Sequence, residues 1–401
     1  MPPVKITENV YSVGVLNPAL RVFDIVMSTE YGTSYNAYLA RGEKTALVET
    51  CHRSFFEEYV ENISAVCKPE EIDFIILNHT EPDHSGALAG LLELCPHAEI
   101  YCSQAASLFL KAITNRPDIT LHVVKDGETL DLGGLTLQFI SAPFLHWPDS
   151  IFTYLPEENL LFTCDFLGSH YCEPRVLDRH ITYEEAYEAS FKGYYEAIFG
   201  PFPAYVRQGL EKIRALTCVD TICPSHGPVL TKGERYEFAM EKYAKWSTPL
   251  PASKDIPIFY VSAYGCTRAL AEAAAEGVRE ARPGYNVELY DIIRHSLPEL
   301  GGILNASAAF LIGTPTLNRD ALPPVWQLLS MTDAVNIAKR PVAVFGSYGW
   351  SGEATGAVAE LLKALKLNVF PELLKVNFVP SEVELEKAKT FGRAFGKFTN
   401  S

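Results

Sequence analysis

The residues best suited to chemistry in this sequence gather in one short segment, 77–86. Four of its side chains can bind a metal ion: His79, Glu81, Asp83 and His84. In an extended chain that leaves a strand, His79, Glu81 and Asp83 share one side at a period of two residues, whereas His84 turns away. We therefore expect this segment to offer ligands to two metal ions at once.

Three further ligand-type residues each follow a predicted strand: His146, Asp165 and His226. Strand ends hold side chains on a rigid scaffold that opens into a loop, which is where binding residues are often placed. Taken singly, each of the three fits an ordinary turn or cap. Together with the segment 77–86, they favour metal ligation.

This pattern resembles the metallo-β-lactamase superfamily, whose loop reads H-x-H-x-D-H and is followed by later His, Asp and His residues. Glu81 replaces the second histidine here, and a hard carboxylate favours iron or manganese over a zinc hydrolase site. H-x-E-x-D-H is the pattern of flavodiiron proteins, which the chain resembles along its whole length. The resemblance implies one iron on His79, Glu81 and His146, a second iron on Asp83, His84 and His226, and Asp165 as the bridge between them.

A second candidate site lies in three loops of the C-terminal part, each after a predicted strand. The first loop precedes a helix, and small or hydroxyl residues at a helix N-terminus form a cradle for a phosphate. The motif lacks G-x-G-x-x-G, which argues against a dinucleotide. The candidate residues are Ser262, Ala263, Tyr264, Gly265, Cys266 and Thr267 in the first loop, Pro315, Thr316, Leu317 and Asn318 in the second, and Ser347, Tyr348, Gly349, Trp350 and Gly352 in the third.

These loops resemble the flavin loops of flavodiiron proteins, and the resemblance implies FMN as the second cofactor. Tyr348 and Trp350, set among glycines, suit stacking on a flat isoalloxazine ring. The loops depart from the family pattern in two places. Cys266 stands where a hydroxyl or amide is common and weakens one phosphate contact. In the second loop, Leu317, Arg319 and Asp320 differ from the more usual polar and glycine residues.

The elements that must position these residues fall into two groups, and both are α/β. Residues 1–250 show antiparallel strand patterns followed by mixed strands and helices, which predicts a sheet sandwich flanked by helices. The resemblance makes this a metallo-β-lactamase-like αββα sandwich that carries the diiron site. A Pro-rich break at 248–253 is the predicted linker. In residues 251–401 five strands alternate with helices, which predicts a flavodoxin-like, doubly wound parallel sheet that binds FMN.

The composition supports a folded chain and excludes some partners. Of the 401 residues, 48% are hydrophobic, and the formal net charge is −15. Residues 1–250 hold 34 acidic and 19 basic residues, whereas residues 251–401 hold 15 of each. The excess of acid argues against a nucleic-acid partner and against an anionic membrane. The whole excess belongs to the predicted metal domain.

The cysteines and the N-terminus indicate a cytoplasmic protein. The nine cysteines include no C-x-x-C pair, which is typical of reduced thiols. The N-terminus has no apolar signal core, and no apolar run approaches the roughly 18 residues needed to span a bilayer.

The resemblance implies an oxidoreductase that reduces dioxygen to water, nitric oxide to nitrous oxide, or both, with electrons entering at FMN. A separate rubredoxin or a reduced deazaflavin would donate the electrons. A head-to-tail homodimer, or a dimer of such dimers, would bring one subunit's flavin to the other's irons. Asp24 stands where relatives often have a histidine near the diiron pocket, and His170 is a candidate for an outer contact to the ligands.

Two alternatives belong to other classes of protein. The first is a zinc-dependent hydrolase with an appended flavin domain, which applies if Glu81 does not decide the choice of metal. The second is a flavodoxin-like electron carrier with an inactive metal site.

Overall fold

The computed structural model describes residues 2–249 and 251–399 of the chain. They form two compact units, Met1–Pro249 and Leu250–Ser401. Each unit has its own hydrophobic clusters.

Two sheets form the centre of the first unit. The seven-stranded sheet has the order β1 (Val4–Lys5), β2 (Val10–Ser12), β7 (Tyr38–Arg41), β8 (Thr45–Val48), β9 (Ile72–Leu77), β10 (Glu99–Cys102) and β11 (Leu121–Val123). The six-stranded sheet has the order β12 (Thr129–Asp131), β13 (Thr136–Ser141), β14 (Ile151–Leu155), β15 (Leu160–Cys164), β16 (Thr221–Pro224) and β17 (Leu230–Thr231). Both sheets mix parallel and antiparallel pairs.

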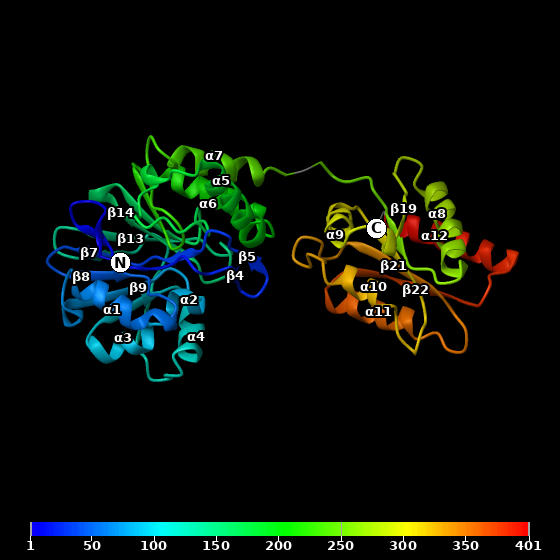
Figure 1. The fold of residues 1–401 in the computed structure, drawn as a ribbon, viewed down its shortest axis with the longest axis horizontal. Helices are drawn as coiled ribbons and strands as arrows, with labels where there is room; N and C mark the ends of the chain where they lie inside the picture. The colour runs from blue at the N-terminus through cyan, green and yellow to red at the C-terminus, as the bar shows by residue number, and fades with distance from the viewer. Residues whose placement is uncertain (1, 250, 400–401) are drawn as a thin grey trace. The chain divides into compact units, whose positions relative to one another are not determined.

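Helices cover the outer face of each sheet (Figure 1). On the seven-stranded sheet they are α1 (Phe56–Ser64), α3 (Leu88–Leu94) and α4 (Gln104–Ile113). On the six-stranded sheet they are α5 (Glu184–Tyr194), α6 (Pro203–Ala215) and α7 (Tyr236–Trp246). The predicted αββα sandwich is confirmed.

These layers follow from the way side chains alternate between the two faces of each strand. In β9, Ile75 packs in the cluster under α1, while its neighbour Ile76 packs between the sheets against Phe162 of β15. Successive side chains of a strand point to opposite faces, so a strand that is covered on both sides reads as a continuous apolar run. The run Ile72–Leu77 therefore ends in a rigid, fully buried position, directly before the first metal-ligand candidates.

Two small antiparallel pairs lie beside the sandwich. One joins β3 (Val15–Asn17) to β6 (Thr33–Tyr35), and the other is the hairpin of β4 (Val22–Phe23) and β5 (Met27–Ser28). Asp24 and Ile25 at the tip of this hairpin have positive φ angles of 47° and 68°.

A single parallel sheet forms the centre of the second unit, as predicted. Its order is β19 (Leu289–Asp291), β18 (Ile258–Tyr260), β20 (Phe310–Pro315), β21 (Pro341–Tyr348) and β22 (Asn368–Asn377). One face packs on α9 (Leu297–Ala306), α10 (Pro323–Leu329) and α11 (Ala354–Ala364). The other face packs on α8 (Cys266–Ala281) and α12 (Glu382–Phe398).

Some elements were not predicted from the sequence, and α9 shows why. Its sequence contains a proline and two adjacent glycines, which are poor helix formers. The proline lies in the first turn, where it is tolerated, and Ser296 caps the helix by accepting a hydrogen bond from the Glu299 amide. Among residues 2–249 and 251–399, no helix is long and apolar enough to cross a membrane.

Candidate functional site

The first two metal-ligand candidates leave β9 in an extended loop, and the next two lie in a short helix. This helix, α2 (Pro82–Ser85), contains Asp83 and His84. The expected alternation at period two therefore stops at Glu81, and the expectation that His84 turns away is wrong. Adjacent residues of a helix are about 100° apart, so one turn can aim both side chains into the same cavity.

The later candidates reach the same cavity from the six-stranded sheet. Asp165 comes directly after β15, and His226 comes two residues after β16. His146 lies in the loop between β13 and β14. The structure thus brings together all seven residues that the sequence analysis singled out.

One group of side chains surrounds a carboxylate oxygen of Glu81. Its Oε2 lies 3.4 Å from His79 Nε2 and 3.2 Å from His146 Nε2. The Oδ2 atom of Asp165 lies 3.6 Å from His79 Nε2 and 3.2 Å from His146 Nε2. Two imidazoles and two carboxylates therefore point their ligand atoms at one small volume.

A second group lies on the other side of Asp165. His226 Nε2 is 3.1 Å from Asp83 Oδ2, and His84 Nε2 is 3.3 Å from Asp83 Oδ1. The other oxygen of Asp165, Oδ1, is 3.0 Å from His84 Nε2 and 3.5 Å from His226 Nε2. Asp165 thus gives one oxygen to each group, which is the geometry of a bridging carboxylate.

Unsatisfied polar atoms show that these groups fit a bound cation. Both carboxylate oxygens of Asp83, both ring nitrogens of His84 and Asp165 Oδ1 are buried without a hydrogen-bond partner. Buried polar atoms are almost always paired, so such a concentration calls for a ligand. Cys164 also lies near His84 and Asp165. Burial raises the pKa of its thiol well above the usual value, and a protonated thiol is a poor metal ligand.

The metal-free cluster binds protons strongly. Burial opposes the charged form of His84, but the charges of Asp83 and Asp165 raise its pKa to about 10. Burial likewise opposes protonation of His79, whose pKa is raised well above the usual value by its hydrogen bonds with Asp149 and Glu81. Burial works against ionisation of Asp165, yet His84 holds its pKa well below the usual value. A metal ion would replace these protons.

Sequence reasoning missed the partners that orient the ligand histidines. Asp149 contacts Nδ1 of His79, and the backbone carbonyl of Ser34 accepts a hydrogen bond from His226 Nδ1 at 2.6 Å. Asp149 stands three residues after His146, and this closeness in sequence is the signal that could have found it. His170 Nδ1 lies 2.9 Å from Thr33 Oγ1, which in turn lies 3.3 Å from His226 Nδ1.

Asp24 also reaches the site, from the tip of the β4–β5 hairpin. It shares a hydrogen bond with Glu81. Burial, together with the charges of Glu81 and Asp83, raises the pKa of Asp24 to about 6. A protonated Asp24 can donate this hydrogen bond.

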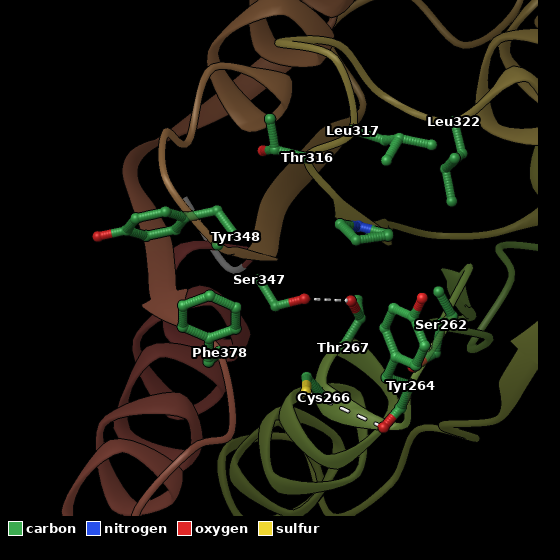
Figure 2. Close-up of a pocket in the computed structure, with 13 residues that line it drawn as sticks. Ser262, Tyr264, Cys266, Thr267, Thr316, Leu317, Leu322, Ser347, Tyr348 and Phe378 are labelled. Atoms are coloured by element: carbon green, nitrogen blue, oxygen red, sulfur yellow. Dashed lines mark hydrogen bonds between the residues drawn. The ribbon is translucent and has the colours of Figure 1, made fainter.

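The second site is a cavity of about 240 Å³ at the carboxyl end of the parallel sheet (Figure 2). The residues of the three predicted loops that line it are Ser262, Ala263, Tyr264, Cys266, Thr267, Pro315, Thr316, Leu317, Ser347, Tyr348 and Gly349. Figure 2 shows Thr267 opposite Ser347, and their hydroxyls are hydrogen-bonded at 2.8 Å. Leu322 and Phe378 add apolar walls that the sequence analysis did not include.

The remaining predicted flavin residues are not among the cavity lining. They are Gly265, Asn318, Trp350 and Gly352. Gly265 is the N-cap of α8 with φ of 82°, a conformation that glycine adopts without strain, and the Ser262 hydroxyl accepts a hydrogen bond from the Arg268 amide in the first turn at 3.2 Å. Trp350 is 80% exposed. The first backbone amides of α8 lack partners within the helix and fit an anionic group such as a phosphate.

Comparisons with known proteins identify both units. The family described as "ODP family beta lactamase" matches residues 33–227, and the flavodoxin family matches residues 258–392. A flavo-diiron protein of Clostridium acetobutylicum is 50% identical over 399 residues, which cover 99% of this chain and 100% of the relative. The chain belongs to the flavodiiron protein family.

Other members of the flavodiiron family match over nearly the whole chain. A nitric oxide reductase of Moorella thermoacetica is 35% identical, covering 98% of this chain and 97% of the relative. The solved rubredoxin oxygen:oxidoreductase of Desulfovibrio gigas is 29% identical with a TM-score of 0.68, covering 99% and 98% of the two chains. The flavodiiron protein of Giardia intestinalis is 30% identical with a TM-score of 0.66, covering 100% and 97%. The predicted combination of a metallo-β-lactamase-like and a flavodoxin-like fold is confirmed.

Proposed function

We propose that the chain is an oxidoreductase that reduces dioxygen to water, nitric oxide to nitrous oxide, or both. Its cofactors are two non-haem irons and FMN. The relatives named nitric oxide reductase and rubredoxin oxygen:oxidoreductase support this activity. The observation that carries the proposal is the pair of ligand groups that share the two oxygens of Asp165.

We assign one iron to each ligand set. His79, Glu81 and His146 would hold one iron, Asp83, His84 and His226 would hold the other, and Asp165 would bridge them. Mixed imidazole and carboxylate ligands suit iron in both of its common oxidation states. When bound, FMN would divide a two-electron supply into single electrons, and the irons would supply a redox-active binding site for the diatomic substrate.

The chain's own residues keep this chemistry in a dry and rigid site. His79 and His84 are almost completely buried, and Asp149 and the Ser34 carbonyl fix the rings of two ligand histidines. Asp24, which is exposed at the tip of the β4–β5 hairpin, interacts with Glu81. A protonated Asp24 places a proton beside the reacting volume, where the reduction of either gas consumes protons.

The flavin would occupy the cavity of the second unit. The amides at the start of α8 and the hydroxyls of Ser262 and Thr267 would hold the phosphate, and Tyr348 and Trp350 would flank the ring. Support comes from the location of the cavity at the carboxyl ends of parallel strands, where open α/β sheets bind their ligands.

The metal content separates this function from its rivals. Protein expressed with iron and riboflavin should contain about two irons and one FMN per chain, as the two ligand groups and one cavity require. Stoichiometric zinc together with esterase or thioesterase activity would instead indicate the hydrolase. A chain with FMN and no bound metal would indicate the electron carrier.

A rubredoxin-type carrier is the electron donor that we propose, with a reduced deazaflavin as the second candidate. The relatives named rubredoxin oxygen:oxidoreductase and flavorubredoxin support the first. Flavin reduction by each donor under argon distinguishes them. The nine cysteines are all free thiols, which fits the cytoplasmic location that we propose.

We further propose a head-to-tail homodimer, alone or paired into a tetramer. Each unit exposes large apolar side chains beside its site. Ile25 and Val26 lie next to Asp24 and are 93% and 84% exposed, while Tyr264 at the flavin cavity is 95% exposed. Such residues at the surface commonly mark protein interfaces.

Subunit complementation tests this arrangement. A chain with Asp165→Asn loses the metal bridge, and a chain with Ser262→Arg fills the phosphate cradle, so each alone should be inactive. Co-expressed chains should regain activity in mixed dimers if flavin and irons from different subunits work together. Mixed dimers that remain inactive would show that each flavin serves its own chain.

A further inference from the structure

Asp149 is a buried carboxylate with a fixed position behind one metal ligand. Its side chain is fully buried, and its two oxygens lie 3.2 and 3.1 Å from Nδ1 of His79. Thr80 fixes Oδ2 further, with its backbone amide at 2.8 Å and its hydroxyl at 2.6 Å. The imidazole of His79 is therefore held between this carboxylate and the metal position at Nε2.

The histidines of the other metal position lack such a partner. Nδ1 of His226 donates to a neutral carbonyl, that of Ser34, at 2.6 Å, and Nδ1 of His84 is buried without a hydrogen-bond partner. The His79 side has the carboxylates of Glu81 and Asp149 in addition to its share of Asp165. The His226 side has Asp83 and its share of Asp165.

This difference has a direct electrostatic consequence. A carboxylate that accepts the Nδ1–H of a metal-bound imidazole makes that imidazole a stronger electron donor. A further negative charge in a buried site also favours the more highly charged ion, because the protein interior screens charge weakly. Both effects stabilise ferric iron over ferrous iron at the position of His79.

We propose that Asp149 is a positioning residue that makes the two irons unequal. With one electron in the oxidised pair, an iron held by Asp83, His84 and His226 would be ferrous, and an iron held by His79, Glu81 and His146 would be ferric. The electron comes from the reduced flavin or an added reductant such as dithionite, and no covalent bond forms or breaks. The proposal rests on the proposed function, because it requires that both metals are iron.

Redox titration of the full, iron-loaded and FMN-loaded protein tests the role of Asp149. The measured quantity is the comproportionation constant of the pair, obtained from the mixed-valent EPR signal. Asp149→Asn removes the negative charge and raises the potential of the harder-to-reduce iron, so the two potentials approach each other. The constant should fall about tenfold or more, and Mössbauer spectra of the one-electron-reduced protein should show a changed ferric component.

Asp178 supplies a matched control in the same unit. It is a buried carboxylate that accepts hydrogen bonds from the Thr231 amide and hydroxyl, both at 2.7 Å, and from the Arg235 amide at 2.9 Å. Asp178 thus accepts hydrogen bonds from a threonine amide and hydroxyl, as Asp149 does from Thr80, but these hydrogen bonds include no histidine. Asp178→Asn should leave the constant unchanged.

A second variant tests the idea if Asp149→Asn does not fold. Thr80→Val removes the 2.6 Å hydrogen bond that the Thr80 hydroxyl donates to Asp149 Oδ2. More negative charge then faces His79, so the comproportionation constant should rise. The proposal is overturned if iron-loaded Asp149→Asn keeps the native constant, if Asp178→Asn lowers it equally, or if Thr80→Val lowers it. Zinc in place of iron would instead refute the proposed function itself.

Discussion

Among single residues, Asp165 is the side chain on which both metal positions depend. It gives Oδ2 to the His146 side and Oδ1 to the His84 side. Asp165→Asn should therefore lower the iron content at both positions, because an amide is a weaker ligand than a carboxylate and supplies no charge. His226→Asn should empty only one position, because His226 belongs to a single group.

Iron analysis and Mössbauer spectroscopy of purified protein check this difference, with the FMN content as the measure of folding. Equal iron loss in both variants, at normal FMN content, would contradict the bridging role of Asp165.

Also at the residue scale, the metal-free protein should lose stability as the pH rises. The folded-state pKa of His84 is raised from 6.5 to about 10. A raised pKa contributes stability that is complete below the unfolded pKa and is lost as the pH climbs towards the folded one. Burial raises the pKa of Glu49 from 4.5 to about 8, which acts in the same direction.

Urea unfolding of metal-free protein between pH 6.5 and 8.5 measures this effect. The free energy of unfolding should fall over this range, by an amount on the order of a few kcal/mol. Iron-loaded protein is the control and should show a smaller fall, because the metal has displaced the protons of the ligand histidines and only the contribution of Glu49 remains. A metal-free stability that is flat or rising with pH would contradict the proton-binding cluster.

At the scale of elements, α8 and α12 pack through glycines. A Cβ at Gly277 of α8 would lie 1.9 Å from the Lys389 carbonyl oxygen of α12, and a Cβ at Gly392 would lie 2.0 Å from the Ala274 carbonyl oxygen. Gly277→Ala must push the helices apart and should destabilise the flavodoxin-like unit by about 1–3 kcal/mol.

Gly356 of α11 is the matched control, because a Cβ there meets nothing within 4 Å. Gly356→Ala should stabilise the same unit by up to about 1 kcal/mol, since alanine is the better helix former. Chemical unfolding, monitored by the release of flavin, measures the stability of both variants. Equal effects of the two substitutions would contradict the close helix contact.

The elements also show what sequence can and cannot predict. Apolar runs with clear ends marked β9 and β15, so His79 and Asp165 could be placed at strand ends before the fold was known. The turn of α2 could not be predicted, because four residues show no helical period. Asp149 was missed for a different reason. Its role depends on a contact with His79 across 70 positions of sequence, which no local pattern records.

At the scale of the whole molecule, the two units have separate cores. The clusters of the metal unit contain only residues up to Tyr243, and those of the second unit begin at Ile256. A fragment of residues 251–401 should therefore fold alone, bind FMN and lack iron, and it should also lack the acidic excess of the full chain. Flavin absorbance and circular dichroism of the fragment check this. A fragment that does not bind FMN, while the full chain does, would contradict the two-domain proposal.

The proposed function requires that electrons pass from the flavin to the metal centre and on to a diatomic gas. The most direct test is rapid mixing of fully reduced, iron-loaded protein with nitric oxide and with dioxygen, with flavin reoxidation monitored by absorbance. Because free flavins react slowly with dioxygen themselves, Asp165→Asn with equal FMN content is the reference. We expect that at least one gas reoxidises the flavin far faster in the native protein than in Asp165→Asn. Equal rates in the two proteins with both gases would contradict it.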